Sequence, residues 1–192
     1  MNLPALLKPV QGAVFAIVLL AGCAGNTGDN AGDGVADPSW ETARQTTMVA
    51  EIKKARPEFS LPTLAGDTLS SSDLDNKVVL VNFWATWCGP CVIETPELVA
   101  LHDEWKDRPF EIVGISMDEE GFEIVAPFAD DFQISYPIIL DDGELADEFG
   151  GVYALPTTFI VDAAGQIRHR FIGIFPIEDM REELEKLLDQ AN

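Results

Sequence analysis

The stretch VVLVNFWATWCGPC, residues 78–91, joins a mostly apolar run to two cysteines that are separated by two residues. The run Val78–Trp84 is typical of a strand that is buried on both faces of a sheet. Pro90 lacks a backbone N–H and therefore suits the first turn of a helix, where that donor has no partner. The stretch predicts a strand, a short loop and a helix that begins near the cysteines.

Cys88 and Cys91 at such a junction are typical of reversible dithiol–disulfide chemistry. A helix N-terminus presents unpaired N–H groups and a partial positive charge, which favour the thiolate of Cys88, the nucleophile in disulfide exchange. A Cys-x-x-Cys pair is also half of a zinc site, but the sequence has no second such pair and no His-x-x-x-His to complete it. We predict that the two histidines, His102 and His169, are exposed rather than metal ligands, and we expect no metal site.

Residues 1–22 predict an export signal. They contain one base, Lys8, no acid, and an apolar run over Ala13–Ala21 that is too short to span a membrane. They end in Leu-Ala-Gly before Cys23, which resembles the lipobox of bacterial lipoproteins. The resemblance implies cleavage before Cys23 and a lipid anchor on that residue. An ordinary secretory signal and an uncleaved helix are the alternatives.

The cysteine count and the net charge limit which cellular compartment and which kinds of partner fit the chain. The chain has three cysteines, which would leave one unpaired thiol in an exported protein. Lipidation of Cys23 removes that problem and leaves Cys88 and Cys91 to pair. The formal net charge of −21 disfavours nucleic acid and anionic lipid surfaces as partners. We therefore expect a lipid-anchored protein that faces the periplasm of a bacterium, with the choice of inner or outer membrane left open.

The chain is expected to have three parts: a signal peptide at residues 1–22, a lipid-anchored tether at 23–56 and one folded domain at 57–192. Residues 24–38 are rich in Gly, Asn, Asp and Ala and contain no aromatic side chain, which is typical of a flexible linker. After Ser39, a residue type favoured at N-caps, apolar or small side chains recur at helical spacing from Trp40 to Ala55. This spacing predicts a short amphipathic helix at the end of the tether.

From Pro57 onward the hydrophobic pattern alternates between strand and helix signals. Turn residues at 65–67 and 163–165 each separate two strand-like runs and predict hairpins. The expected strands are at 59–64, 68–69, 78–84, 110–117, 136–140, 158–162 and 167–172, and the expected helices are at 90–106, 121–132, 144–149 and 177–188. This order predicts an α/β fold with a mixed central sheet that is covered on both faces by helices.

Two motifs carry a family likeness. Residues 84–91, WATWCGPC, and residues 155–159, LPTTF, resemble the thioredoxin superfamily. Three further features are similar to its TlpA/ResA/DsbE-like branch of membrane-anchored thiol–disulfide oxidoreductases (redoxin or AhpC/TSA-like): Glu94-Thr95-Pro96, the predicted hairpin that begins at Phe59, and the long segment between Met117 and Tyr136. The likeness covers residues 57–192 and implies a thioredoxin-like fold with an N-terminal β-hairpin and a central insertion.

The resemblance implies that the Leu155–Pro156 bond is cis and faces the cysteines. A cis X–Pro bond turns the chain tightly and leaves neighbouring backbone groups free to pair with an extended substrate. A trans proline that opens a strand is the alternative. By the same resemblance, the catalytic residues are Cys88, Cys91, Glu94 and Pro156, and the substrate-binding residues are Trp87, Gly89, Pro90, Leu155 and Thr157.

Glu94 shares one face of the predicted helix with Cys91, Leu98 and Trp105, and that face must pack on the sheet. Burial disfavours a charged carboxylate, so we expect a raised pKa for Glu94. An acid of raised pKa one turn after Cys91 is suited to moving the proton of that thiol. Cytoplasmic thioredoxins carry a buried acid at the position of Asn82, which cannot titrate. A surface glutamate favoured by the helix dipole is the alternative.

We expect an exported enzyme that reduces protein disulfides with no cofactor beyond the Cys88/Cys91 pair. Gly89 and Pro90 supply no charged group to hold the thiolate, so the sequence predicts a thioredoxin-like potential, nearer about −270 mV than about −120 mV. The resemblance implies two kinds of partner: disulfide-containing exported proteins, with apocytochrome c among the candidates, and a membrane electron donor of the CcdA/DsbD type. Thr157 stands where the cytochrome-maturation relatives carry Glu, which weakens the case for that specialised role.

Two other classes of function stay open. Thiol peroxidases of this fold carry Thr three residues before the reactive cysteine, where this chain has Ala85, while Thr86 is one residue too late. A copper or haem chaperone would use both thiols for binding. Copper carriers of this fold space their cysteines by three residues and add a nearby His, and neither feature is present. A peroxide assay and a copper(I) titration separate these classes from a reductase.

Overall fold

The computed structural model describes residues 47–141 and 143–191, so the predicted signal peptide, Cys23 and the tether up to residue 46 lie outside it. Its strands are β1 (Thr47–Ala55), β2 (Ser60–Pro62), β3 (Thr68–Ser70), β4 (Val78–Trp84), β5 (Phe110–Ser116), β6 (Ile138–Leu140), β7 (Thr157–Val161) and β8 (Gln166–Ile172). Its helices are the 3₁₀ turn η1 (Ser71–Leu74), α2 (Gly89–Trp105), α3 (Phe122–Phe132), α4 (Leu145–Glu148) and α5 (Ile177–Gln190).

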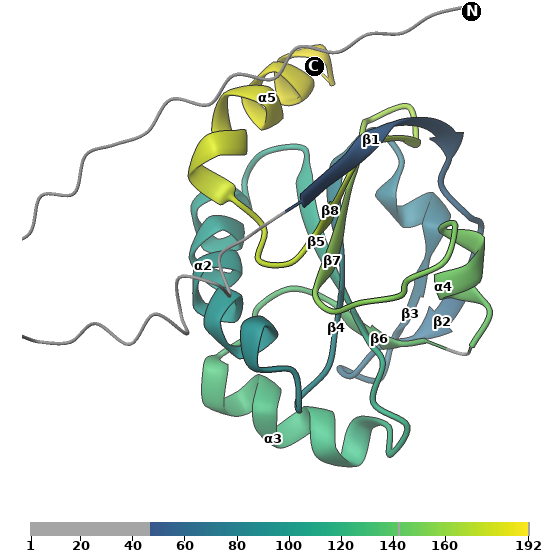
Figure 1. The fold of residues 1–192 in the computed structure, drawn as a ribbon, viewed down its shortest axis with the longest axis vertical. Coiled ribbons are helices and arrows are strands. Elements are labelled where there is room, and N and C mark those ends of the chain that lie inside the picture. The colour runs from purple at the N-terminus through teal and green to yellow at the C-terminus, as the bar shows by residue number, and fades with distance from the viewer. Residues whose placement is uncertain (1–46, 142, 192) are drawn as a thin grey trace, which may run out of the picture. The chain divides into compact units, whose positions relative to one another are not determined.

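In the described ranges, six strands form the main sheet in the order β1-β8-β7-β4-β5-β6. β4, β5 and β6 run parallel, whereas β7, β8 and β1 are added through antiparallel pairings (Figure 1). All residues of β4 are buried. The predicted bounds of this strand, Val78–Trp84, are confirmed, because a strand that is mostly apolar on both faces fits the middle of a sheet.

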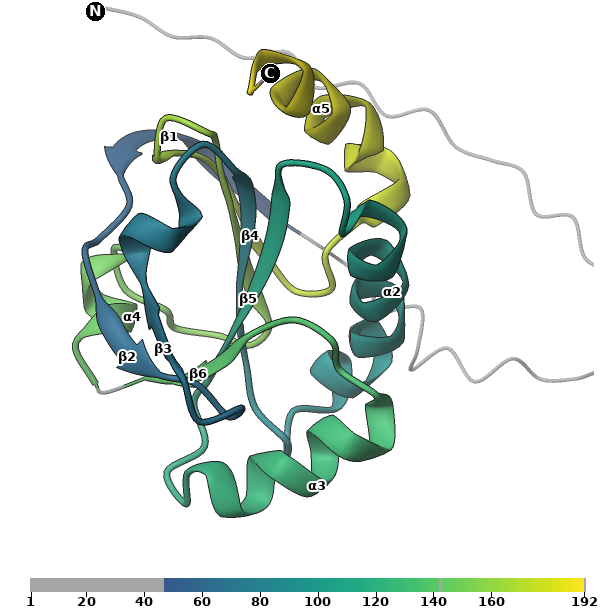
Figure 2. The ribbon, with the colours of Figure 1, turned by 180° about the vertical axis from the view of Figure 1, so that it is seen from behind.

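The sheet separates two hydrophobic cores, because successive residues of a strand point to opposite faces. Leu80 of β4 packs into the core that contains Leu98 of α2 and Leu184 of α5. Phe83 belongs to the opposite core, where its ring contacts Phe149 with centroids 5.4 Å apart. Figures 1 and 2 show α2, α3 and α5 on the first face and the β2–β3 hairpin, η1 and α4 on the second. Each buried side chain of this size stabilises the fold by about 1.5–3 kcal/mol.

The two predicted hairpins and the central insertion are confirmed. β2 pairs with β3, and β7 pairs with β8, both antiparallel. Thr63, just after β2, forms a bridge with Ile139 of β6, which attaches the small hairpin to the main sheet. α3 occupies the insertion between Met117 and Tyr136, and β6 follows directly after it. No helix in the described ranges is long and apolar enough to cross a lipid bilayer.

The helix predicted at the end of the tether is wrong over residues 47–55, which form β1. This strand pairs antiparallel with β8, with two register shifts along its length. Without β1, the backbone groups on the outer side of β8 would form an unpaired sheet edge. Pairing across the sheet therefore overrides the local helical spacing over these residues, and β1 extends the main sheet on the N-terminal side of Pro57. The earlier part of the predicted helix lies outside the described residues.

Candidate active site

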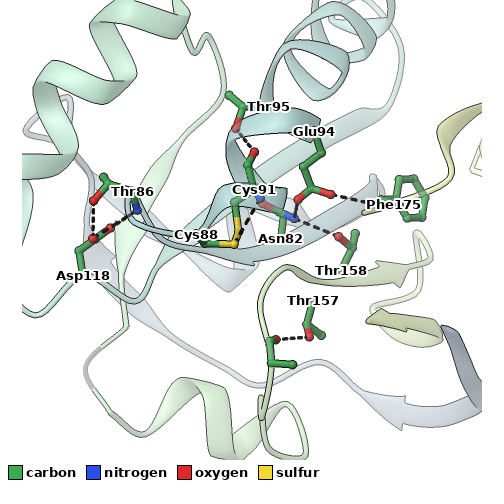
Figure 3. Close-up of a disulfide and its surroundings, with 11 residues drawn as sticks. Asn82, Thr86, Cys88, Cys91, Glu94, Thr95, Asp118, Thr157, Thr158 and Phe175 are labelled. Atoms are coloured by element: carbon green, nitrogen blue, oxygen red, sulfur yellow. Dashed lines mark hydrogen bonds between the residues drawn. A yellow bond between two sulfur atoms is a disulfide. The ribbon is translucent and has the colours of Figure 1, made fainter. Parts of the chain in front are cut away.

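Cys88 and Cys91 lie at the N-terminus of α2 and form a disulfide, with their Cα atoms 5.2 Å apart. Cys88 is the N-cap residue, Gly89 begins the helix, and Pro90 follows in the first turn. The backbone N–H of Cys91 donates to Cys88 Sγ at 3.3 Å. Figure 3 shows the disulfide at the end of this helix. The predicted junction of strand, loop and helix is therefore confirmed.

The two sulfurs differ in exposure. Cys91 is completely buried, while Cys88 keeps 5% of its surface and lines an open cleft of about 610 Å³. In the reduced protein, the Cys91 N–H and the partial positive charge of the helix N-terminus stabilise a thiolate on Cys88. Cys88 is therefore the sulfur that an incoming disulfide can reach.

Four of the five predicted substrate-binding residues line the same cleft as Cys88: Trp87, Gly89, Pro90 and Leu155. Thr157 does not fit the prediction, because its side chain is fully buried and its hydroxyl donates to the carbonyl of Ala154 at 2.7 Å. It supports the turn before β7 and presents no surface to a client. Tyr153, which the sequence did not single out, also lines the cleft.

The Leu155–Pro156 peptide bond is cis, as the family resemblance implied. Pro156 is buried, and its carbonyl accepts a hydrogen bond from the N–H of Gly173 at 2.8 Å. This bond connects the turn before β7 to the loop between β8 and α5. Because Leu155 and Cys88 line one cleft, the cis-proline turn and the start of α2 face the same space.

Glu94 is 1% exposed and lies on the buried face of α2 with Cys91, Leu98 and Trp105, as the helical spacing predicted. Burial raises the pKa of the Glu94 carboxyl to about 7, although hydrogen bonds from Phe175 and Asn82 act in the opposite direction. Desolvation therefore outweighs the two hydrogen bonds. The result is a carboxyl, one turn after Cys91, that exchanges its proton near neutral pH.

The two hydrogen-bond partners of Glu94 come from two segments that are distant from it in the sequence (Figure 3). Asn82 Nδ2 of β4 donates to Glu94 Oε1 at 2.8 Å and to Thr158 Oγ1 at 3.0 Å. The backbone N–H of Phe175 donates to Glu94 Oε2 at 2.9 Å. The sequence identified Asn82 as a residue that cannot titrate but did not predict its role as a donor. Alternation along β4 could have revealed it, because Asn82 must point to the same face as Leu80, towards α2.

A second buried carboxylate, Asp118, holds the loop before Cys88. Thr86 donates to it twice, through its backbone N–H at 3.0 Å and its hydroxyl at 2.7 Å. Ser116 Oγ adds a third hydrogen bond at 2.8 Å. The sequence reasoning missed Asp118. Its position just after β5 was a usable signal, because the carboxyl ends of neighbouring parallel strands meet at one edge of a sheet.

The two histidines are not exposed as predicted. The His102 side chain is 12% exposed, and its ring nitrogens contact Ser135 Oγ at 2.8 Å and Glu111 Oε1 at 3.0 Å. The His169 side chain is 19% exposed and faces Glu183. Each packs on a neighbouring element that local sequence could not reveal. Within the described ranges, no group of three or more His, Cys, Asp or Glu side chains is placed to hold a metal ion.

Comparison with known proteins agrees with this geometry. Residues 52–170 match the AhpC/TSA family. The chain is 35% identical over 130 residues to the thioredoxin-like protein YneN of Bacillus subtilis, which covers 67% of this chain and 76% of that protein. It is 33% identical over 138 residues to the thiol-disulfide oxidoreductase ResA of Bacillus thuringiensis, with 72% of this chain and 77% of that protein covered.

The fold is also similar to solved structures. A thiol:disulfide interchange protein of the thioredoxin family from Chlorobium tepidum superposes with a TM-score of 0.66 at 32% identity, covering 73% of this chain and 99% of that chain. The thioredoxin-like fold expected from the sequence is therefore confirmed. The region that matches the family contains Cys88, Cys91, Glu94 and Pro156. By sequence and by fold, this chain belongs to the AhpC/TSA family.

Proposed function

We propose that the chain is a thiol–disulfide oxidoreductase whose reduced Cys88/Cys91 pair cleaves disulfide bonds in exported proteins. The observation that carries the proposal is the position of the pair at the start of α2, with Cys88 in the cleft and Cys91 buried behind it. Relatives named as thiol-disulfide oxidoreductases share this domain, which supports the same class of activity. The reaction needs no bound cofactor, because the two sulfurs carry both electrons.

The reaction proceeds in two exchange steps. The Cys88 thiolate attacks one sulfur of a client disulfide, forms a mixed disulfide and releases the other client sulfur as a thiolate. Cys91, once deprotonated, attacks Cys88 Sγ, which releases the second client thiol and closes the Cys88–Cys91 disulfide. Two electrons pass to the client. A separate donor must then reduce the pair before the next cycle.

Glu94 is the candidate proton acceptor for Cys91. Both residues are buried on one face of α2, one turn apart (Figure 3). A thiol that is completely buried cannot pass its proton to bulk water directly, so a nearby group must take it. A carboxyl with a pKa of about 7 can accept that proton when ionised and later release it to solvent. The pair Cys91 and Glu94 therefore supports the second step.

The direction of electron flow is proposed to be reductive. Gly89 and Pro90 stand between the cysteines and add no charge to hold the Cys88 thiolate, so the reduced form gains less stability than in strong oxidants. We expect a potential nearer about −270 mV than about −120 mV, and a value above about −180 mV would reverse the assigned direction. Equilibration with a glutathione redox buffer series measures it.

The setting follows from the predicted lipid anchor on Cys23. An anchored protein outside the cytoplasm works in an oxidising compartment, where a dithiol does not persist without a supply of electrons. The proposed donor is a membrane protein of the CcdA/DsbD type. The proposed clients are exported proteins with disulfides, apocytochrome c among them.

The first experiment traps the client with the Cys91→Ala variant. Removal of the resolving thiol should leave clients joined to Cys88 as stable mixed disulfides, which mass spectrometry of the adducts identifies. The matched control is Cys88→Ala, which keeps only the buried thiol of the pair, Cys91, and should trap nothing. Equal adduct formation by the two variants would show that the assignment of Cys88 as nucleophile is wrong.

A further inference from the structure

We propose that Tyr153 is a specificity-determining residue, which selects client segments that carry a large apolar or aromatic side chain next to the attacked cysteine. The inference rests on the proposed function, because it concerns the cleft through which Cys88 reaches its clients. Tyr153 lies on the turn before the cis bond at Pro156, and it lines that cleft together with Trp87 and Cys88.

The Tyr153 side chain is unusually exposed for an aromatic residue. In the described ranges, the large apolar side chains that are exposed are Trp87 at 69%, Ile93 at 47% and Tyr153 at 85%. Two of these three border the cleft at the disulfide, and Ile93 is two residues after Cys91 on α2. Exposed aromatic side chains that gather at one place mark a binding surface, since rings of this kind contribute strongly to contacts.

The ring of Tyr153 rests on a built support. The guanidinium of Arg170 lies over it, 5.9 Å from the ring centre, and that arginine is 8% exposed. Arg170 Nη2 also donates to the carbonyl of Gly151 at 2.5 Å, which fixes the backbone beneath the ring. A ring that is held in place before binding loses less conformational entropy when a client arrives.

Because Gly151 has no side chain, the Tyr153 ring can occupy the space next to it. A Cβ atom at Gly151 would lie 2.5 Å from Tyr153 Cζ and closer still to its hydroxyl, so the ring would have to move. The preceding residue, Gly150, provides a contrast. Both glycines have positive φ angles, +97° and +84°, but a Cβ at Gly150 would meet nothing within 4 Å. Alanine at Gly151 would therefore both displace the Tyr153 ring and strain the backbone, whereas alanine at Gly150 would only strain the backbone.

The chemistry of the cleft defines the occupant. The side chains that line it are uncharged, and they include Met117, Val152 and Leu155 in addition to the two aromatic rings. The protein as a whole carries a net charge of −21, which repels acidic peptides. The occupant that fits is an extended segment of an exported polypeptide, with an apolar or aromatic residue beside its cysteine and few acids.

The test uses the reduced full-length protein and three disulfides: two neutral peptide disulfides that differ only in having Phe or Ser beside the cysteine, and bis(2-hydroxyethyl) disulfide. The wild-type protein should reduce the Phe peptide about tenfold faster than the Ser peptide, the effect of one aromatic contact. Tyr153→Ala should abolish this preference, and Tyr153→Phe should keep it. The rate with the small disulfide, which offers no side chain to Tyr153, measures the reactivity of Cys88 in each variant separately from the peptide preference.

The glycine pair provides the matched control. Gly151→Ala should weaken the preference although Tyr153 is still present, whereas Gly150→Ala should leave it intact. Equal rates for the two peptides in the wild-type protein, or an unchanged preference in Tyr153→Ala, would overturn the inference while leaving the proposed function standing. A wild-type protein that reduces none of the three disulfides would refute the proposed function and this inference with it.

Discussion

Two buried carboxyl groups flank the disulfide, and they are held differently. Asp118 lies beside the loop before Cys88 and receives three hydrogen bonds from Thr86 and Ser116. Thr86 follows β4 and Ser116 ends β5, and these two strands are neighbours in the sheet. Glu94, on the α2 side, receives one hydrogen bond at each oxygen, from Asn82 and from the N–H of Phe175. Both are almost completely buried.

The difference teaches how one site can contain two buried carboxyls with different roles. Hydrogen bonds to an ionised carboxylate favour its charged form, and desolvation opposes that form. At Glu94 desolvation is the larger effect, and the pKa rises to about 7. We interpret Asp118 as the anchor that positions the loop before Cys88 and Glu94 as the group that handles protons. The following predictions test this division of roles.

The largest effect is expected from Glu94→Gln, which keeps the size of the side chain but removes the titrating group. At neutral pH the rate of peptide disulfide reduction should fall about a hundredfold, the lower range for loss of a general acid or base. The rise of the wild-type rate around pH 7 should disappear from the pH profile. The matched control is Glu97→Gln on the exposed side of the same helix, and an equal loss in both variants would contradict a specific role for Glu94.

The same variant should change how stability depends on pH. Burial raises the pKa of Glu94 above its unfolded value of 4.5, so the stability linked to its proton is complete below about pH 4.5 and is lost as the pH rises through about 7. From pH 4.5 to pH 8 the wild-type free energy of unfolding should fall by about 3 kcal/mol relative to that of Glu94→Gln. Urea titrations of the oxidised proteins measure this, and parallel pH curves would refute it.

A smaller loss is expected from Asp118→Ala, which removes the acceptor of one buried and two partly buried hydrogen bonds. The free energy of unfolding should fall by about 2 kcal/mol, because Ser116 and Thr86 are left with shielded donors that lack this acceptor. The pH profile of disulfide reduction should keep its wild-type midpoint. Glu119→Ala, the exposed neighbour, is the control for loss of an acid in this segment. A shifted midpoint with unchanged stability would reverse the roles assigned to the two carboxyls.

The smallest effect is expected from Asn82→Ala. The Asn82 amide lowers the pKa of Glu94 by donating to its carboxylate, so its loss should move the midpoint of the pH profile upward by about half a pH unit, the worth of one hydrogen bond. Thr158→Val is a matched control, because Thr158 bonds to Asn82 and not to Glu94 through the contacts described. A downward shift in Asn82→Ala would show that the sign assigned to this hydrogen bond is wrong.

Sequence patterns predicted most of the main chain because the signals there are local. The bounds of β4 follow from a mostly apolar run, and the start of α2 follows from Pro90 beside the cysteines. The burial of Glu94 follows from helical spacing alone, since a side chain in register with Cys91 and Leu98 must face the sheet. Each of these features depends on residues within a few turns of one another.

Tertiary structure decided what depends on contacts between distant segments. Residues 47–55 have a helical pattern, yet they form β1 because the edge of β8 offers backbone partners. Thr157 is buried, and the two histidines are partly covered, by elements that their own neighbours in sequence do not specify. The pKa of Glu94 and the contact of Arg170 with the Tyr153 ring likewise require pieces of chain that only folding brings together. Local periodicity fixes which face of an element is buried, whereas the partners on that face depend on the packing of the whole sheet.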